Sequence, residues 1–68
     1  MILTAVIIPA PEGGFTALNP ETGTTTQGGS VEEALENLRE ATELYLEEFP
    51  IDTPGQPLVT TFQVGARA

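Results

Sequence analysis

One amphipathic stretch, Ser30 to Phe49, sets the architecture that is open to this 68-residue chain. Its mostly apolar positions recur at steps of four, three, four, three and four residues, which is the repeat of an α-helix buried along one face. These positions are Val31, Leu35, Leu38, Thr42, Tyr45 and Phe49, with Ala34 and Ala41 beside them. Pro50 ends the run, because proline lacks the amide hydrogen that a helix interior needs. We therefore predict one long helix that packs through one side.

The beginning of this helix carries the signature of a capping box. The Ser30 hydroxyl can accept a hydrogen bond from the backbone N–H of Glu33, and the Glu33 carboxylate can reach back to the N–H of Ser30. The opposite side of the helix carries Glu32, Glu36, Glu40, Glu43 and Glu47, with Arg39 among them. A row of glutamates at helical spacing is usually a solvated face, so this side should meet water.

The length of the chain allows one domain, so residues 1–68 are expected to share a single core. A chain of this size buries only about 60% of its extended surface, which leaves a marginal core. The sequence contains no cysteine and no histidine, and therefore no disulfide and none of the usual zinc ligands. Self-association is the remaining common remedy, and we expect a homodimer or homotetramer.

Charge and hydropathy restrict the partners of the protein. The apolar run Ile2 to Ile8 is too short to cross a membrane and lacks the basic flank of a signal peptide, so we expect a soluble cytoplasmic protein without membrane contact. Ten acidic side chains against two arginines give a formal net charge of −8. Phosphate contacts supply much of the affinity for nucleic acids, so direct DNA or RNA binding by this chain is not expected. The acidity favours a basic partner, although solubility alone would also explain it.

Three segments before the helix have the composition of strands. Residues 1–8 are rich in β-branched side chains and apolar on both sides, so we predict a central or covered strand there. Gly13 and Gly14 favour a hairpin into a second strand at 15–18, because glycine tolerates a positive φ. The polar, threonine-rich segment 24–27 is typical of an edge strand.

A fourth strand is predicted after the helix, at 58–64. One of its faces consists of Leu58, Thr60, Phe62 and Val64. The loop at 50–57 contains three prolines and should be stiff, and 65–68 should be a frayed end. The predicted order is β-β-β-α-β, an α+β fold in which one long helix packs on one face of an antiparallel sheet. The expected core residues are Phe15, Leu35, Leu38, Tyr45, Phe49 and Phe62.

Several turn and cap motifs occur in an order and spacing that resemble the HicB family of antitoxins. The family pattern is a hairpin with Gly-Gly-aromatic, a Pro-Glu turn, and a Gln-Gly step into a capped helix that opens with Glu-Glu-Ala-Leu-x-Asn. The matching residues are Gly13-Gly14-Phe15-Thr16-Ala17, Pro20-Glu21 and Gln27-Gly28-Gly29-Ser30-Val31-Glu32-Glu33-Ala34-Leu35-Glu36-Asn37-Leu38-Arg39-Glu40-Ala41. Glu47-Glu48-Phe49-Pro50 and Pro57-Leu58-Val59-Thr60-Thr61-Phe62 are similar to the short members of the family. The likeness covers nearly the whole chain.

This resemblance implies a partial RNase H-like fold that binds and blocks HicA, a small basic ribonuclease toxin with a double-stranded-RNA-binding-like fold. The implied role is that of the antitoxin in a type II toxin–antitoxin system. The sequence departs from the family pattern at Gly29, where Asp is usual, and in the turn at 20–28, which lacks the usual Pro-Gly-Cys stretch. Many members continue into a C-terminal DNA-binding domain that has no counterpart here, so operator binding by this chain is not expected.

The residue types available do not favour catalysis. An RNase H-like nuclease needs carboxylates on its central strands to hold two divalent metals, and residues 1–10 contain none. The chain has no histidine or lysine to activate Ser30 or Tyr45, which are better explained as a helix cap and a core residue. The paired glycines lack the other residues of a phosphate-binding loop. We therefore expect a protein that is not an enzyme and has no catalytic, cofactor or metal site.

A binding surface is the function that remains. From the charge and the resemblance we hypothesise that a basic HicA-like toxin meets six acidic side chains, and that the effect appears mainly in the association rate. These side chains are Glu12, Glu21, Glu36, Glu40, Glu43 and Glu47. The alternative is a stand-alone structural or regulatory oligomer that has lost its toxin partner. A separate hypothesis is that the sheet edges or the last strand build a homodimer.

Overall fold

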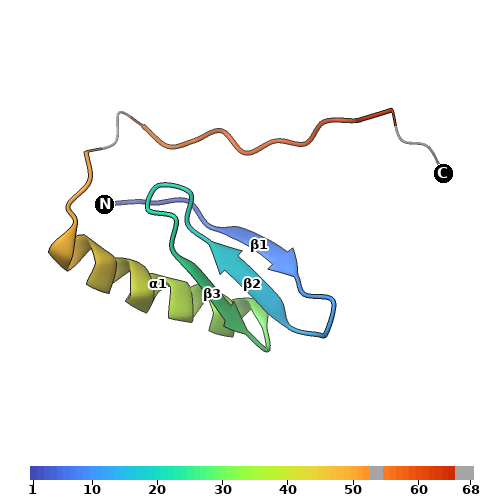
Figure 1. The fold of residues 1–68 in the computed structure, drawn as a ribbon, viewed down its shortest axis with the longest axis horizontal. Helices are drawn as coiled ribbons and strands as arrows, with labels where there is room; N and C mark the ends of the chain where they lie inside the picture. The colour runs from blue at the N-terminus through green and yellow to red at the C-terminus, as the bar shows by residue number, and fades with distance from the viewer. Residues whose placement is uncertain (53–54, 66–68) are drawn as a thin grey trace.

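A computed structural model describes residues 1–52 and 55–65. Three strands precede one helix: β1 (Val6–Pro9), β2 (Phe15–Leu18), β3 (Thr25–Gly28) and α1 (Val31–Glu48). The strands form one antiparallel sheet in the order β1-β2-β3, and α1 packs on one face of it (Figure 1). The α+β class and the long helix are therefore confirmed. Two residues of the proline-containing loop, at 53 and 54, and residues 66–68 of the predicted frayed end lie outside the described residues.

The β1–β2 hairpin turns at the two glycines that the sequence indicated. Gly13 and Gly14 have φ angles of +106° and +77°, a region that residues with a Cβ rarely adopt. The N–H of Ala10 donates to the carbonyl oxygen of Gly14 at 3.0 Å, and the N–H of Gly13 donates to that of Ala10 at 3.0 Å. This turn fixes the register in which Pro9 lies opposite Phe15 and Val6 opposite Leu18.

The first strand differs from its prediction in extent and in position. The sequence predicted a central or covered strand at 1–8. Strand β1 begins at Val6 rather than Met1 and lies at an edge of the sheet, so it is not central. It is covered only in part, because Val6 and Ile7 are half-buried and Ile8 is exposed. Strand β2 is central instead, because it pairs with β1 on one side and with β3 on the other. The edge position of β3 is confirmed.

The helix cap is confirmed in one half and corrected in the other. The Ser30 hydroxyl accepts a hydrogen bond of 3.1 Å from the N–H of Glu33. The Glu33 carboxylate accepts from the N–H of Gly29 and not, as predicted, from that of Ser30. Both bonds satisfy amide groups that a helix start leaves without partners in the helix.

Close contact between β3 and the first turns of α1 holds the helix on the sheet. A Cβ on Gly28 would lie 2.4 Å from the backbone nitrogen of Ala34, so only glycine fits between strand and helix there. Two side chains reinforce the contact: the Thr26 hydroxyl donates to the carbonyl oxygen of Ala34 at 3.0 Å, and the Asn37 amide donates to that of Gln27 at 2.8 Å.

The hydrophobic core is small. Its buried apolar members among the described residues are Ala17, Ala34 and Leu38, with Ile7 and Phe15 packed against them. Leu38 and Phe15 were predicted core residues, and Tyr45 is half-buried with its ring centroid 5.0 Å from that of Phe49.

Three other predicted core residues are exposed, so these predictions are wrong. The exposed fractions of Leu35, Phe49 and Phe62 are 46%, 60% and 86%. For Leu35 and Phe49 the cause is the difference in length between the layers, since a four-residue strand spans about 13 Å and the 18-residue helix about 27 Å. Phe62 is exposed because the segment that contains it joins no strand of the sheet. The sheet covers only part of the apolar side of α1.

The predicted fourth strand at 58–64 does not form. Described residues 55–65 run as an extended segment along the β1 side of the molecule and pair with no strand (Figure 1). The observed order is therefore β-β-β-α. Strand composition alone does not make a strand, because its backbone groups need a neighbour at hydrogen-bonding distance.

Candidate functional site

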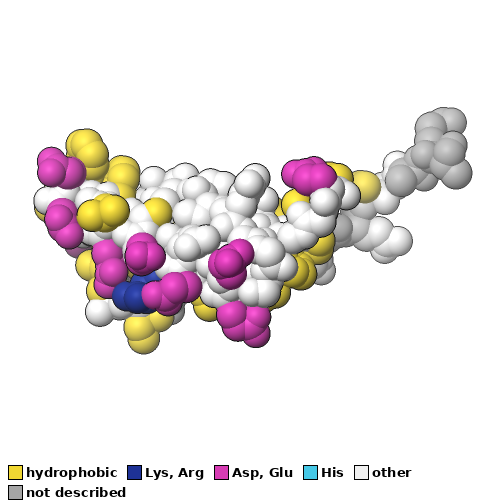
Figure 2. All heavy atoms as spheres, turned by 90° about the horizontal axis from the view of Figure 1, so that it is seen from below, with side chains coloured by type: hydrophobic (Ala, Val, Ile, Leu, Met, Phe, Trp, Pro, Cys, Tyr) yellow, Lys and Arg dark blue, Asp and Glu magenta, His cyan; other side chains and the backbone are white. Residues whose placement is uncertain are grey.

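Four of the six predicted partner-binding residues lie together on α1. Glu36, Glu40, Glu43 and Glu47 are all exposed and follow one another at steps of four, three and four residues, and we call them the acidic stripe. At 3.6 residues per turn these steps place the four carboxylates on one side of the helix. Figure 2 shows acidic side chains gathered along the helix side of the molecule, with the dark blue arginine between them.

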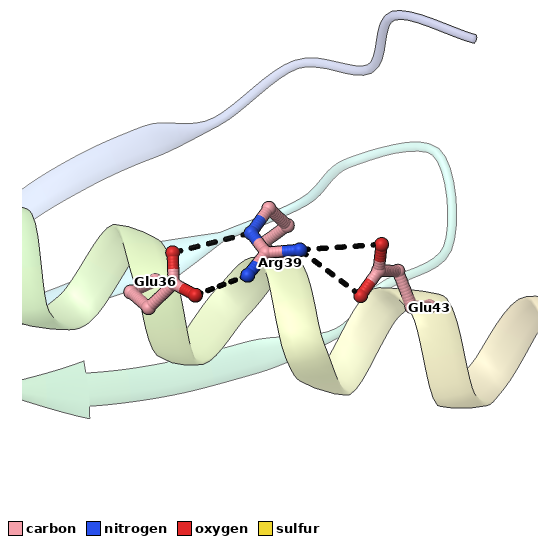
Figure 3. A network of polar contacts seen from close by, with 3 residues as sticks. All are labelled: Glu36, Arg39 and Glu43. Atoms are coloured by element: carbon pink, nitrogen blue, oxygen red, sulfur yellow. Dashed lines mark hydrogen bonds and ion pairs between the residues drawn. The ribbon is translucent and has the colours of Figure 1, made fainter.

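Arg39 lies inside the acidic stripe and binds two of its members (Figure 3). Its guanidinium donates two hydrogen bonds to the Glu36 carboxylate and lies 3.2 Å from Glu43 Oε1. The hydrogen bond from Arg39 is the main reason why the pKa of Glu36 lies below its usual value. The bond to Glu36, with the charges of Glu36, Glu43 and Glu40, raises the pKa of Arg39. Two of the four negative charges are therefore partly neutralised within the chain.

Glu40 and Glu47 are the members of the acidic stripe whose charge is left for a partner. Both are exposed, and neither forms an ion pair with a described residue. A basic group that approaches the stripe would meet these two carboxylates without first displacing Arg39.

The other two predicted residues lie away from the stripe. Glu12 is exposed in the β1–β2 hairpin, beside a shallow hollow formed with Phe15 and Gly29. Glu21 belongs to the turn between β2 and β3, where its carboxylate accepts hydrogen bonds from the backbone N–H and the hydroxyl of Thr4 at 3.0 and 2.9 Å. The structure thus brings four of the six residues together and gives Glu21 a structural contact.

The surroundings of Glu21 act on its pKa in opposite directions. Desolvation tends to raise the pKa, but the hydrogen bonds from the Thr4 backbone and hydroxyl, followed by those from the Glu21 backbone and the Asn19 side chain, together lower it below 4.5. The Asn19 amide lies 2.6 Å from Glu21 Oε1 and is itself buried. This network ties the segment before β1 to the turn after β2.

An apolar groove that the sequence did not reveal lies between α1 and residues 1–5, which we call the N-terminal segment. Its volume is about 650 Å³. Its apolar lining consists of Met1, Leu3, Ala5, Leu35, Leu38 and Leu46. The groove exists because α1 packs mainly on β3 and β2 and hardly contacts β1. The sequence indicated the long apolar side of the helix, but the short strands that leave part of it uncovered are seen only in the structure.

Thr42 contributes a buried hydroxyl to the groove, whose polar lining also includes Thr4, Asn19, Glu36, Arg39 and Glu43. Thr42 is 7% exposed, yet its hydroxyl has no hydrogen-bond partner among the described residues. A buried hydroxyl without a partner costs free energy, so a groove occupant with a backbone carbonyl would complete the site.

Within the described ranges, no group of three or more acidic side chains has the geometry to hold a metal ion. In the same part of the chain, no helix has the length and apolar character required to cross a membrane. The Ser30 hydroxyl is occupied as the helix cap. The arrangement of side chains offers surfaces for binding.

Comparison with family models, with curated proteins and with solved structures finds no match to this chain.

Proposed function

We propose that this protein is a non-enzymatic antitoxin that binds and neutralises a basic HicA-type mRNA-cleaving toxin. The observation that carries the proposal is the acidic stripe on α1, in which Glu40 and Glu47 keep exposed carboxylates without an ion pair among the described residues. The formal net charge of −8 adds a field that attracts a cationic partner over a longer distance.

The mechanism of neutralisation is occlusion. A ribonuclease of this class needs a positively charged surface to hold RNA, because phosphate contacts supply much of the affinity. An acidic helix that covers this surface competes with the RNA backbone for the same cationic side chains. The antitoxin needs no chemistry of its own for this role, which agrees with a chain that has no histidine or lysine.

The fold supports this proposal in its order of elements. Three antiparallel strands followed by one helix on a sheet face agree with the first four elements of a partial RNase H-like fold. We assign that fold as part of the proposal, together with a cytoplasmic location and the absence of direct nucleic-acid binding. The motif order from Gly13 to Ala41 is the second support.

The decisive experiment compares two charge-reversal variants that carry the same charge. Glu40→Lys with Glu47→Lys changes the unpaired part of the acidic stripe, and Glu48→Lys with Asp52→Lys changes two exposed acids outside it. Each double variant shifts the formal net charge from −8 to −4, since each substitution adds two units. Binding to a catalytically inactive HicA-type toxin encoded beside this protein is measured by stopped-flow mixing at low and high salt.

We expect the stripe variant to lower the association rate by about tenfold at low salt, with a smaller effect at high salt. The control variant should lower it much less, because its changed residues lie outside the contact surface. Rescue from toxin-induced growth arrest should be lost in the same order. Equal effects of the two variants would show that net charge alone acts, and the absence of any complex with the toxin would refute the proposal.

The alternative is a stand-alone structural or regulatory oligomer that has lost its toxin. The apolar groove and the exposed apolar side chains after α1 are what favour it, because they offer contacts that need no basic partner. A stable homo-oligomer together with a failure to bind or rescue from any neighbouring basic protein would support this alternative.

A further inference from the structure

The segment 57–64 after α1 is extended, apolar and exposed, and we call it the tail segment. Leu58 and Phe62 on one of its faces are 89% and 86% exposed, and Val64 is 65% exposed. Among the described residues, the hydrogen bond that joins this end of the chain to the rest runs from the Gln56 amide to the carbonyl oxygen of Ile2, at 3.5 Å. Side chains of this kind are normally buried, so the tail segment has the character of one half of an interface.

The second half lies on the β1 side of the same protein. Strand β1 is an edge strand, and a sheet edge offers backbone groups to which a further strand can bind. The apolar groove between the N-terminal segment and α1 lies on the same side, where α1 hardly contacts β1. An extended segment with apolar side chains on one face is the shape that both features accept.

Charge favours contact between these two parts. Two copies of a chain with a formal net charge of −8 repel each other over most of their surfaces. Neither residues 1–11 nor residues 55–65 contain a charged side chain. The tail segment and the N-terminal segment are therefore the places where two copies approach with the least repulsion between side chains.

We propose that the tail segment of one copy binds along the β1 edge and in the apolar groove of a second copy, and that the exchange is reciprocal, which gives a homodimer. The tail segment and the N-terminal segment contribute uncharged residues to this interface, whereas Glu36, Arg39 and Glu43 also line the groove. Glu40 and Glu47, on which the proposed toxin binding depends, are not among the residues that line it. The contact is self-complementary, as a two-fold dimer requires.

A second copy, rather than the same chain, is favoured by the position of the tail segment. Within one chain this segment passes the N-terminal segment and still leaves Leu58 and Phe62 exposed (Figure 1). Pro50 and Pro57 restrict the loop that precedes it, because proline holds φ near one value. Exchange between copies would bury the segment and enlarge a core with few buried apolar residues.

Thr42 provides an independent indication that the groove has a peptide-like occupant. Its hydroxyl is buried in the groove lining and lacks a hydrogen-bond partner among the described residues. A backbone carbonyl of the incoming tail segment would accept a hydrogen bond there, whereas a purely apolar occupant could not.

The first test measures the mass of the 68-residue protein in solution and of two matched variants. Phe62→Asp places a charge on the face with Leu58, and Gln63→Asp places the same charge on the opposite face. Light scattering coupled to size exclusion at micromolar concentrations should give twice the monomer mass of 7.2 kDa for the unchanged protein and for Gln63→Asp. Phe62→Asp should weaken dimerisation by about tenfold or more. Circular dichroism at 222 nm confirms that α1 remains folded in each variant.

The second test locates the tail segment in the unchanged protein. An equal mixture of ¹³C-labelled and unlabelled chains is examined by isotope-filtered NMR, which detects only contacts between chains. We expect contacts from Leu58 and Phe62 of one chain to Leu35 and Leu46 of the other. A monomer, a dimer that Phe62→Asp leaves intact, or contacts of the tail segment found only within one chain would each overturn the proposal.

Discussion

The side-chain amide of Asn19 donates a hydrogen bond of 2.8 Å to the backbone carbonyl oxygen of Thr4. Asn19 is 2% exposed, and its side-chain oxygen accepts a second bond of 2.9 Å from the N–H of Thr22. The same amide donates to Glu21, which in turn binds Thr4. One buried amide therefore holds the segment before β1 against the turn between β2 and β3.

Replacement of Asn19 by alanine should destabilise the protein. Asn19→Ala leaves the Thr4 carbonyl and the Thr22 N–H without their partner, and a buried polar group without a partner costs about 1–3 kcal/mol. Urea unfolding followed by circular dichroism measures the free energy of unfolding. Asn37→Ala is the control, since it removes an exposed amide that donates to the Gln27 carbonyl at 2.8 Å. A loss of the same size in both variants would mean that burial of Asn19 adds nothing.

Glu21 should make the stability of the protein dependent on pH in the acidic range. The hydrogen bonds described above lower the pKa of Glu21 in the folded state below 4.5. A lowered pKa means that the carboxylate stabilises the folded state above 4.5 and that this contribution is lost as the pH falls through the folded-state value.

The measurement is urea unfolding of the protein and of Glu21→Gln between neutral and acidic pH. Glu21→Gln should be the less stable at neutral pH, and the difference should shrink once the pH falls below 4.5. Glu12→Gln, in an exposed position outside this network, serves as the control. A difference between Glu21→Gln and the unchanged protein that stays constant with pH would contradict the assignment.

Gly28 should not tolerate a side chain, in contrast to its neighbour Gly29. A Cβ at Gly28 would lie 2.4 Å from the Ala34 nitrogen and 2.8 Å from its Cα, which are backbone atoms that cannot rotate away. A Cβ at Gly29 meets the Glu33 Oε1 at 3.5 Å, an ordinary contact.

Gly28→Ala should therefore cost at least about 1–3 kcal/mol, the usual range for overpacking, and Gly29→Ala much less. Thermal unfolding is a suitable measurement, since about 1 kcal/mol corresponds to about 4–8 °C in a domain of this size. Equal melting temperatures for the two variants would show that α1 can move away from β3 at little cost.

The Ser30 cap should contribute to the stability of α1. Ser30→Ala removes the oxygen that accepts from the Glu33 N–H at 3.1 Å, and loss of such a cap costs about 0.5–2 kcal/mol. Ser30→Asp keeps an acceptor at the same position and should be close to neutral. If Ser30→Ala unfolds at the same urea concentration as the unchanged protein, water replaces the hydroxyl as a cap without loss.

The sequence alone determined those elements that depend on residues a few positions apart in the chain. The helix, its serine cap and the glycine hairpin were predicted within a residue or two, because each depends on neighbours a few positions apart. Pairing of Arg39 with Glu36 and Glu43 has the same origin, since residues three and four apart share a helix side. The grouping of the acidic stripe could be inferred from spacing alone.

Contacts between distant residues were decided only by the tertiary structure. Apolar composition could not tell whether β1 is central or an edge, because that depends on whether another strand arrives beside it. Likewise, residues 58–64 have the composition of a strand but no neighbour to pair with within the described chain. The bond from Asn19 to Thr4, and the groove left where α1 extends past short strands, arise from packing between segments that no local pattern brings together.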